Sequence, residues 1–178
     1  MPYFKKLILM IALIIPIAIA SGQDGSIDDL KFLIGTWETR EDNDKKTWWE
    51  KSTRIIKYTL DSTTIELKAE AISSSGKKRK YAWYIHYNSK KNQFEMVSIF
   101  SNWHEILFDI LEWDEENRKL SIRHDPDRSS GDYSERFGEI VFNESFDSYT
   151  WTGENKFGNP DEPSTWNYLE TGKRKTQN

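Results

Sequence analysis

The chain has 178 residues, of which 30% are charged, 14% are aromatic and none is cysteine. That length is enough for one domain with a substantial core, and the lack of cysteine excludes both disulfides and lipid attachment through a cysteine. When Lys5 and Lys6 of the N-terminal segment are set aside, 23 of the 25 basic residues remain against 29 acidic ones. This negative balance argues against nucleic acid or an anionic membrane as the partner.

The first twenty residues have the pattern of a secretory signal peptide. Lys5 and Lys6 precede an unbroken apolar run over 7–20, which ends in small residues of the kind that signal peptidase reads. The run is shorter than the ~20 residues of a membrane-spanning helix, and Pro16 interrupts it. We therefore expect cleavage after Ala20, a periplasmic or secreted location, and no stable membrane insertion afterwards. An uncleaved anchor is the alternative.

The remaining chain divides into a short linker, 21–28, and one domain, 29–175. Helical features are confined to 26–33, where Ser26 is a candidate N-cap and Asp28 and Asp29 lie in the first turn. From there the sequence alternates with period two between clusters of turn residues. The expected strands are 36–40, 47–58, 63–72, 80–87, 93–101, 103–114, 119–124, 132–142, 148–154 and 165–173.

About ten antiparallel strands at hairpin spacing predict an all-β fold: a single up-and-down β-barrel with a short N-terminal helical turn. An open sandwich is the alternative. The clearest strand is 63–72, where Ile65, Leu67 and Ala69 alternate with charged residues. In the segment 80–87 both faces are partly apolar, so the pattern leaves open which face points inward.

The start of the first expected strand carries a Gly-x-Trp pattern, Gly35-Thr36-Trp37, directly after the helical turn. This resembles the opening of calycin-type barrels: lipocalins, fatty-acid-binding proteins and small lipocalin-like bacterial families, including nitrobindin-like proteins. In that group a basic residue near the end of the last strand packs across the Trp ring. Arg174, or Lys173, occupies that place here. The resemblance covers 29–175 and implies structural roles for Gly35, Trp37 and Arg174.

The resemblance implies a barrel with room for one small ligand. Eight tryptophans in a polar chain must be buried or must line something, and adjacent Trp48 and Trp49 must face opposite sides of a strand. We therefore expect an exported barrel that binds a small hydrophobic or aromatic molecule, although core filling is the alternative for any single ring. The candidate ligand-binding residues are Trp49, Trp83, Tyr84, His86, Trp103, Arg136 and Trp151.

Two alternatives stay open: an isomerase or hydrolase acting inside the barrel, and a structural envelope protein with a solid core. An inward Arg136, Glu66 or His86 would favour the enzyme. No nucleophile motif or phosphate-binding loop is present.

No metal or cofactor is expected from the sequence. The three histidines, His86, His104 and His124, lie on different expected strands and lack ligand spacing. Nitrobindin-like barrels hold haem through a histidine close to the C-terminus, and this chain has none after His124. The oligomeric state is left open.

Overall fold

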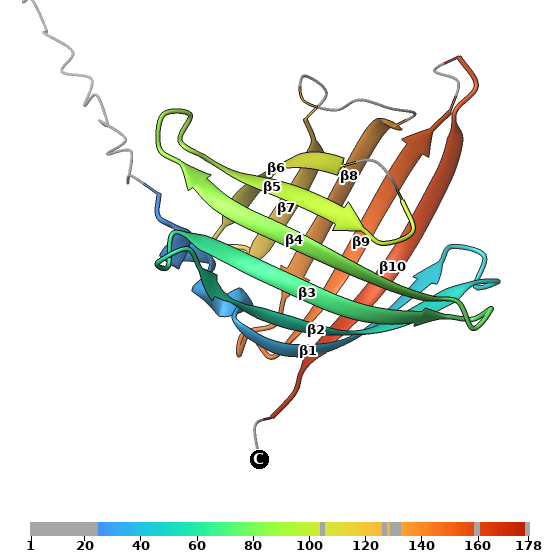
Figure 1. Cartoon of the computed structure of the whole chain (residues 1–178), viewed down its shortest axis with the longest axis horizontal. Coiled ribbons are helices and arrows are strands. Elements are labelled where there is room, and N and C mark those ends of the chain that lie inside the picture. Colours follow the sequence, from blue (N-terminus) through green and yellow to red (C-terminus); the bar gives the residue numbers. More distant parts are fainter. Residues whose placement is uncertain (1–24, 104–105, 126–127, 129–132, 159–160, 177–178) are drawn as a thin grey trace, which may run out of the picture.

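The computed structural model describes residues 25–103, 106–125, 128, 133–158 and 161–176. The predicted signal peptide, 1–20, and the first half of the predicted linker, 21–24, lie outside the described residues. Ten strands form one closed antiparallel barrel, in which each strand pairs with its neighbours in the sequence and β1 pairs with β10 (Figure 1). The expected up-and-down barrel is therefore confirmed, and the open sandwich is excluded.

The elements follow the predicted segments closely. In chain order they are η1 (Ile27–Leu33), β1 (Gly35–Asn43), β2 (Trp49–Thr59), β3 (Thr64–Ser73), β4 (Lys78–Asn88), β5 (Gln93–Phe100), β6 (Ile106–Asp114), β7 (Lys119–His124), β8 (Tyr133–Phe142), β9 (Ser148–Phe157) and β10 (Ser164–Arg174).

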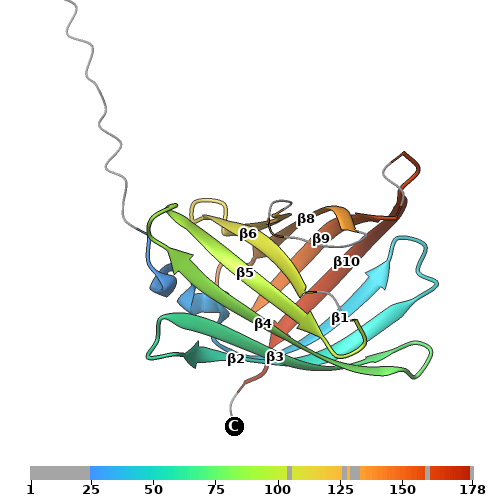
Figure 2. The ribbon, with the colours of Figure 1, turned by 45° about the horizontal axis from the view of Figure 1, so that its top comes forward.

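Alternation along each strand sorts the side chains between the interior and the outer face. On β3, Ile65, Leu67 and Ala69 are buried in the core, whereas Lys68 and Glu70, on either side of Ala69, are exposed. The strands run obliquely around the barrel, so inward side chains from all of them meet in one interior (Figure 2).

On β4 the inward residues are Tyr81, Trp83 and Ile85, each at most 6% exposed. This settles which face of that strand points into the barrel.

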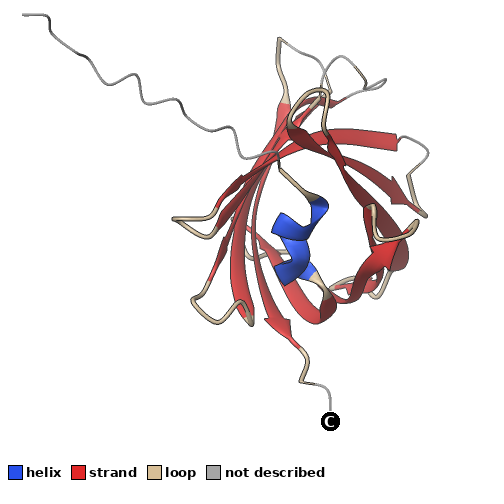
Figure 3. Cartoon of the chain, turned by 90° about the vertical axis from the view of Figure 1, so that its left-hand side faces the viewer, coloured by secondary structure: helices blue, strands red, loops and turns tan. Residues whose placement is uncertain are grey.

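The short 3₁₀ helix η1 lies across one end of the barrel (Figure 3). Ser26 and Asp29 cap its N-terminus in a reciprocal capping box. Phe32 packs against the rings of Trp113 and Phe142, with centroids 4.3 and 4.9 Å apart, so this end is closed by aromatic contacts. Within the described part of the chain, no helix is long and apolar enough to cross a membrane.

Arg174 joins the end of the last strand to the start of the first. Its guanidinium lies 4.5 Å from the centroid of the Trp37 ring, which is a cation–π contact. Gly35 adopts φ +140°, and a Cβ at that position would lie 2.6 Å from Nη1 of Arg174, so this position requires glycine. The guanidinium also donates hydrogen bonds to the backbone carbonyls of Phe32, Ile34 and Phe146.

Candidate functional site: an aromatic cavity at the open end

The end of the barrel opposite η1 contains a cavity of about 340 Å³. The β1–β2 and β3–β4 hairpins reach this end (Figure 1). Nine of its fifteen lining residues are aromatic, so its walls are mainly ring faces and edges. The lining residues are Glu41, Trp48, Arg54, Arg79, Tyr81, Trp83, Phe100, Trp103, Leu107, Arg136, Trp151, Asn155, Phe157, Trp166 and Tyr168.

A larger hollow of about 1070 Å³ lies on the outer side of β1 to β5. Exposed charged side chains such as Lys51, Lys68 and Glu70 line it, and it is open to solvent. We place the candidate site in the smaller interior cavity because enclosure by convergent apolar and polar groups is what distinguishes binding sites.

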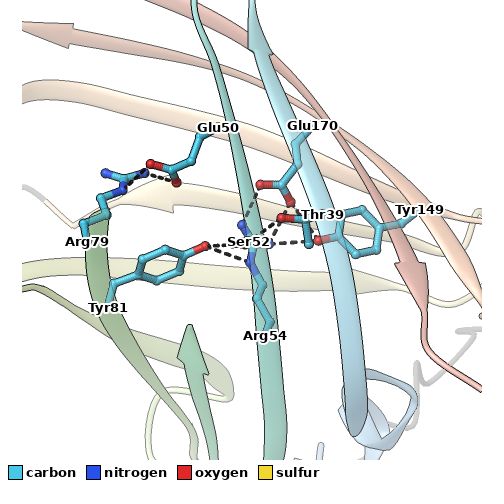
Figure 4. A network of polar contacts seen from close by, with 8 residues as sticks. All are labelled: Thr39, Glu50, Ser52, Arg54, Arg79, Tyr81, Tyr149 and Glu170. Carbon is cyan, nitrogen blue, oxygen red and sulfur yellow. Dashed lines mark hydrogen bonds and ion pairs between the residues drawn. The ribbon is translucent and has the colours of Figure 1, made fainter. Parts of the chain in front are cut away.

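The floor of the cavity is the side chain of Arg54, which reaches from β2 into the centre of the barrel (Figure 4). Its Nη1 and Nη2 donate to the two oxygens of Glu170 on β10, at 2.7 and 2.5 Å. Nε donates to the hydroxyl of Tyr81 at 3.0 Å, and Nη1 also donates to the hydroxyl of Tyr149 at 2.8 Å. A buried charge is stable only with such a complete set of partners.

The two tyrosines of this network stay neutral. Burial raises the pKa of both the Tyr81 and the Tyr149 hydroxyl, so each acts as a hydrogen-bond donor and acceptor. Tyr149 donates to Glu170 at 2.7 Å. Below Arg54, toward η1, the described side chains enclose an apolar void of about 40 Å³, so the arginine separates a tightly packed lower core from the open cavity.

Three glutamates form a row across the cavity wall. Glu41 on β1 lies directly opposite Glu50 of β2 and Glu170 of β10 in the strand register. Arg79 neutralises Glu50, with Nη2 and Nε each 2.7 Å from a carboxylate oxygen, and Arg54 neutralises Glu170. Burial, followed by the charge of Glu170, raises the pKa of the central Glu41 to about 7.

A second charged cluster lies on β6, β7 and β8. Nη1 of Arg136 is 3.4 Å from Oδ2 of Asp109, and Nδ1 of His124 is 3.9 Å from Oδ1 of the same carboxylate. All three side chains are buried. Of these residues only Arg136 lines the cavity, so the cluster adds one arginine to the wall with its own counter-charge.

Several polar atoms of the cavity wall have no partner among the described residues. They are the indole Nε1 of Trp83, the indole Nε1 of Trp151 and the Oδ1 of Asn155. Trp83 and Trp151 are only 6% and 4% exposed. Both nitrogen atoms are enclosed within the wall, and Nε1 of Trp151 lies beside Gly138 on β8.

Glycines in the wall make room for the rings. Gly153 and Gly138 face each other on β9 and β8, and the ring of Tyr168 lies over Gly153. A Cβ on Gly153 would be 2.2 Å from that ring. Because glycine has no side chain, the ring of Tyr168 can lie close against the wall at these positions, and the centre of the cavity stays open.

The structure brings four of the predicted ligand-binding residues together and separates three. Trp83, Trp103, Arg136 and Trp151 line the cavity. Trp49, Tyr84 and His86 lie on the outer face of the wall and do not line this cavity.

The outward residues have partners there. The guanidinium carbon of Arg40 and the Nζ of Lys51 lie 5.5 and 5.4 Å from the centroid of the Trp49 ring. His86 lies 3.7 Å from the carboxylate of Glu95. Tyr84 is paired in register with Glu66, which is itself outward and bound by Lys68 at 2.8 Å. Of the three residues whose inward orientation would favour an enzyme, only Arg136 points inward.

The two histidines that the structure describes lie on opposite faces of the barrel wall. His86 is outside the wall and His124 inside it, and His104 lies outside the described residues. In the described ranges, no group of three histidine or acidic side chains could hold a metal ion.

Sequence reasoning missed the polar half of the site, namely Arg54, Glu170 and Glu41. A signal was present, because Arg54 shares the period-two register of Ser52 and Ile56, and that face is otherwise buried. A charged residue in such a register is either at a strand end or paired with a distant charge.

Comparisons with known proteins bear on the fold of this chain. No model of a protein family matches the sequence, and no curated protein matches it either. The match to the solved structure of Rv2717c from M. tuberculosis spans 84% of this chain and 97% of the Rv2717c chain, with a TM-score of 0.58 and 10% sequence identity. The match to the structure of the S-type phycobiliprotein lyase CPES from Guillardia theta spans 88% of this chain and 96% of the lyase chain, with a TM-score of 0.57 and 14% sequence identity. These likenesses fit a calycin-like barrel and show the fold alone.

Proposed function

We propose that this protein binds one small, planar, largely apolar molecule in the aromatic cavity at the open end of the barrel. The observation that carries the proposal is the cavity itself, about 340 Å³ in volume and lined mainly by aromatic rings. Small-molecule pockets occupy about 300–1,000 Å³ and combine apolar walls with a few oriented polar groups. The solid core of a purely structural protein would leave no such space.

The wall geometry favours a flat ligand. Trp83 and Trp151 meet edge to face, with ring centroids 5.5 Å apart and an interplanar angle of 84°. Trp48 and Trp166 form a second edge-to-face pair at 5.3 Å. Ring faces held in this way offer stacking surfaces to a planar molecule.

The first test measures the binding of 1-methylnaphthalene, a neutral planar molecule of two fused rings, by calorimetry and by tryptophan fluorescence. We expect saturable binding at one site per chain. Trp166→Leu removes a wall of the cavity and weakens binding, whereas Trp49→Leu removes a ring of the outer face and leaves binding unchanged. Equal losses in the two variants would overturn the proposal, and so would the absence of saturable binding both of this compound and of its charged analogues of similar size.

We also propose that the protein acts outside the cytoplasm, which the basic and apolar pattern of residues 1–20 supports. The protein recovered from its own cells should then begin at Ser21. N-terminal sequencing of that protein decides this, and an intact N-terminal segment in the cytoplasmic fraction would contradict export.

A further inference from the structure

The charged groups that line the cavity decide which ligands it accepts. Three arginines, Arg54, Arg79 and Arg136, are among the lining residues, which at first sight favours an anionic ligand. Each of them, however, already has a carboxylate partner. Arg54 is bound to Glu170, Arg79 to Glu50 and Arg136 to Asp109, at distances between 2.5 and 3.4 Å. The arginines therefore carry little uncompensated positive charge into the cavity.

Glu41 is the exception among these charged groups. Its side chain lines the cavity, and the described residues include no hydrogen bond or ion pair to it. The groups facing it are Glu50 and Arg54 from β2, Tyr168 and Glu170 from β10, and Arg79 from β4. With Glu41 ionised, the three arginines face four carboxylates, so the site holds one negative charge in excess.

The surroundings of Glu41 are aromatic on the side of the mouth. Trp48 precedes Glu50 by two residues and Tyr168 precedes Glu170 by two, so both rings lie on the inner face of the wall beside Glu41. Aromatic faces attract cations and do not attract anions. Arg54 already illustrates this in the same cavity, since its guanidinium carbon lies 5.1 Å from the centroid of the Trp83 ring.

We propose that the cavity selects planar aromatic molecules that carry a positive charge, and that Glu41 is the residue that binds this charge. The inference rests on the proposed function and names the class of ligand for the same site. Two observations carry it: the carboxylate of Glu41 in the wall, which lacks an ion-pair partner among the described residues, and the rings of Trp48 and Tyr168, which line the same cavity.

The pH dependence follows from the protonation of Glu41. Its pKa of about 7 in the empty site means that the carboxyl is neutral below this pH and charged above it. A cation stabilises the charged form, so its affinity rises with pH through this range. The affinity of a neutral ligand of the same shape stays nearly constant.

The test compares three ligands of similar size: the permanent cation N-methylquinolinium, the neutral 1-methylnaphthalene and the anion 1-naphthoate. Calorimetry at about pH 5.5 and about pH 8.5 brackets the pKa of Glu41. We expect N-methylquinolinium to bind roughly tenfold more tightly at the higher pH, and more tightly there than the other two ligands. 1-Naphthoate should bind most weakly.

Glu41→Gln keeps the shape of the side chain and removes its charge. This variant should lose the preference for N-methylquinolinium and its pH dependence, while it retains the binding of 1-methylnaphthalene. The matched control is Glu38→Gln on the outer face of the same strand, which should behave as the unaltered protein. A proton titration of the Glu41 carboxyl by NMR gives a second readout, and a bound cation should lower its pKa.

The outcomes separate the two proposals. If none of the three ligands binds, the proposed function fails. If 1-methylnaphthalene binds but the cation has no advantage, or if 1-naphthoate binds most tightly, only the inference about charge is overturned. It is also overturned if Glu41→Gln and Glu38→Gln change cation binding equally.

Discussion

Arg54 and Glu170 form a bidentate ion pair inside the barrel, although their strands, β2 and β10, are separated by β1. The pair therefore ties the first and last parts of the sheet together across the interior, beside the seam at which β1 and β10 close it. Because both side chains are almost fully buried, each depends on the other for its charge compensation.

Breaking this pair should be costly. Arg54→Met leaves the carboxylate of Glu170 buried with only the hydroxyl of Tyr149 as a donor, and we expect a loss of about 3–5 kcal/mol in the free energy of unfolding. Urea denaturation measures the change. The double variant Arg54→Met with Glu170→Leu removes both charges and should recover much of the loss. A single variant that costs less than about 1 kcal/mol would show that the pair does not hold the floor of the cavity.

Arg174 should stabilise the closed end of the barrel. Arg174→Met removes the cation–π contact with Trp37 and the hydrogen bonds to three backbone carbonyls, so we expect a loss of about 2–4 kcal/mol. The neighbouring Lys173 is exposed on the outer face, and Lys173→Met serves as the control with little effect. Thermal unfolding of both variants provides the measurement, and equal stability of the two would contradict this role.

The stability of the protein should depend on Glu41 as the pH changes. The folded-state pKa of Glu41 is raised from 4.5 to about 7, so the folded state binds more protons than the unfolded state between these values. Stability from this group is therefore present below about pH 4.5 and falls as the pH rises to about 7. Glu41→Gln should be more stable than the unaltered protein by roughly 1–3 kcal/mol at about pH 8, since Glu41 is partly exposed to solvent.

This advantage of Glu41→Gln should vanish at about pH 3.5, which lies below both pKa values, so that the carboxyl is protonated in both states. Denaturation curves at several pH values measure it. A constant difference between the two proteins at every pH would contradict the raised pKa.

Gly153 should control the size of the cavity. In Gly153→Ala the new methyl group would lie 2.2 Å from the ring of Tyr168, so the ring has to move toward the centre of the cavity. We expect weaker binding of 1-methylnaphthalene together with a modest loss of stability. Tyr168→Phe, which keeps the ring in place, is the control. Unchanged binding in Gly153→Ala would show that the ligand does not occupy the space beside Tyr168.

The barrel was predictable from the sequence because local patterns encode it. In β3, alternation of apolar and charged residues defines the strand and its two faces, and Ser74 with Gly76 marks the following turn. The helical turn was equally clear from Ser26 as a candidate N-cap and from the acidic residues Asp28 and Asp29 in the first turn. Such signals depend on neighbours in the sequence and on exposure to water, so the order and bounds of the strands follow from them.

The site was only partly predictable because it depends on contacts between distant residues. The partner of Arg54 lies 116 residues further along the chain. The orientation of Tyr84 and His86 was hidden because the outer face at these positions is itself half-buried, where Tyr84 adjoins Glu66 and His86 adjoins Glu95. For adjacent Trp48 and Trp49, alternation required opposite faces but could not say which ring pointed inward.

The most direct test of the account is a crystal structure of the protein soaked with N-methylquinolinium. The account predicts the flat ring system inside the barrel, above Arg54 and against the indoles of Trp83 and Trp151, with the charged nitrogen next to the carboxylate of Glu41. A ligand bound on the outer face of β1 to β5, or an interior cavity that stays empty at saturating ligand, would contradict the central claim that this cavity is the binding site.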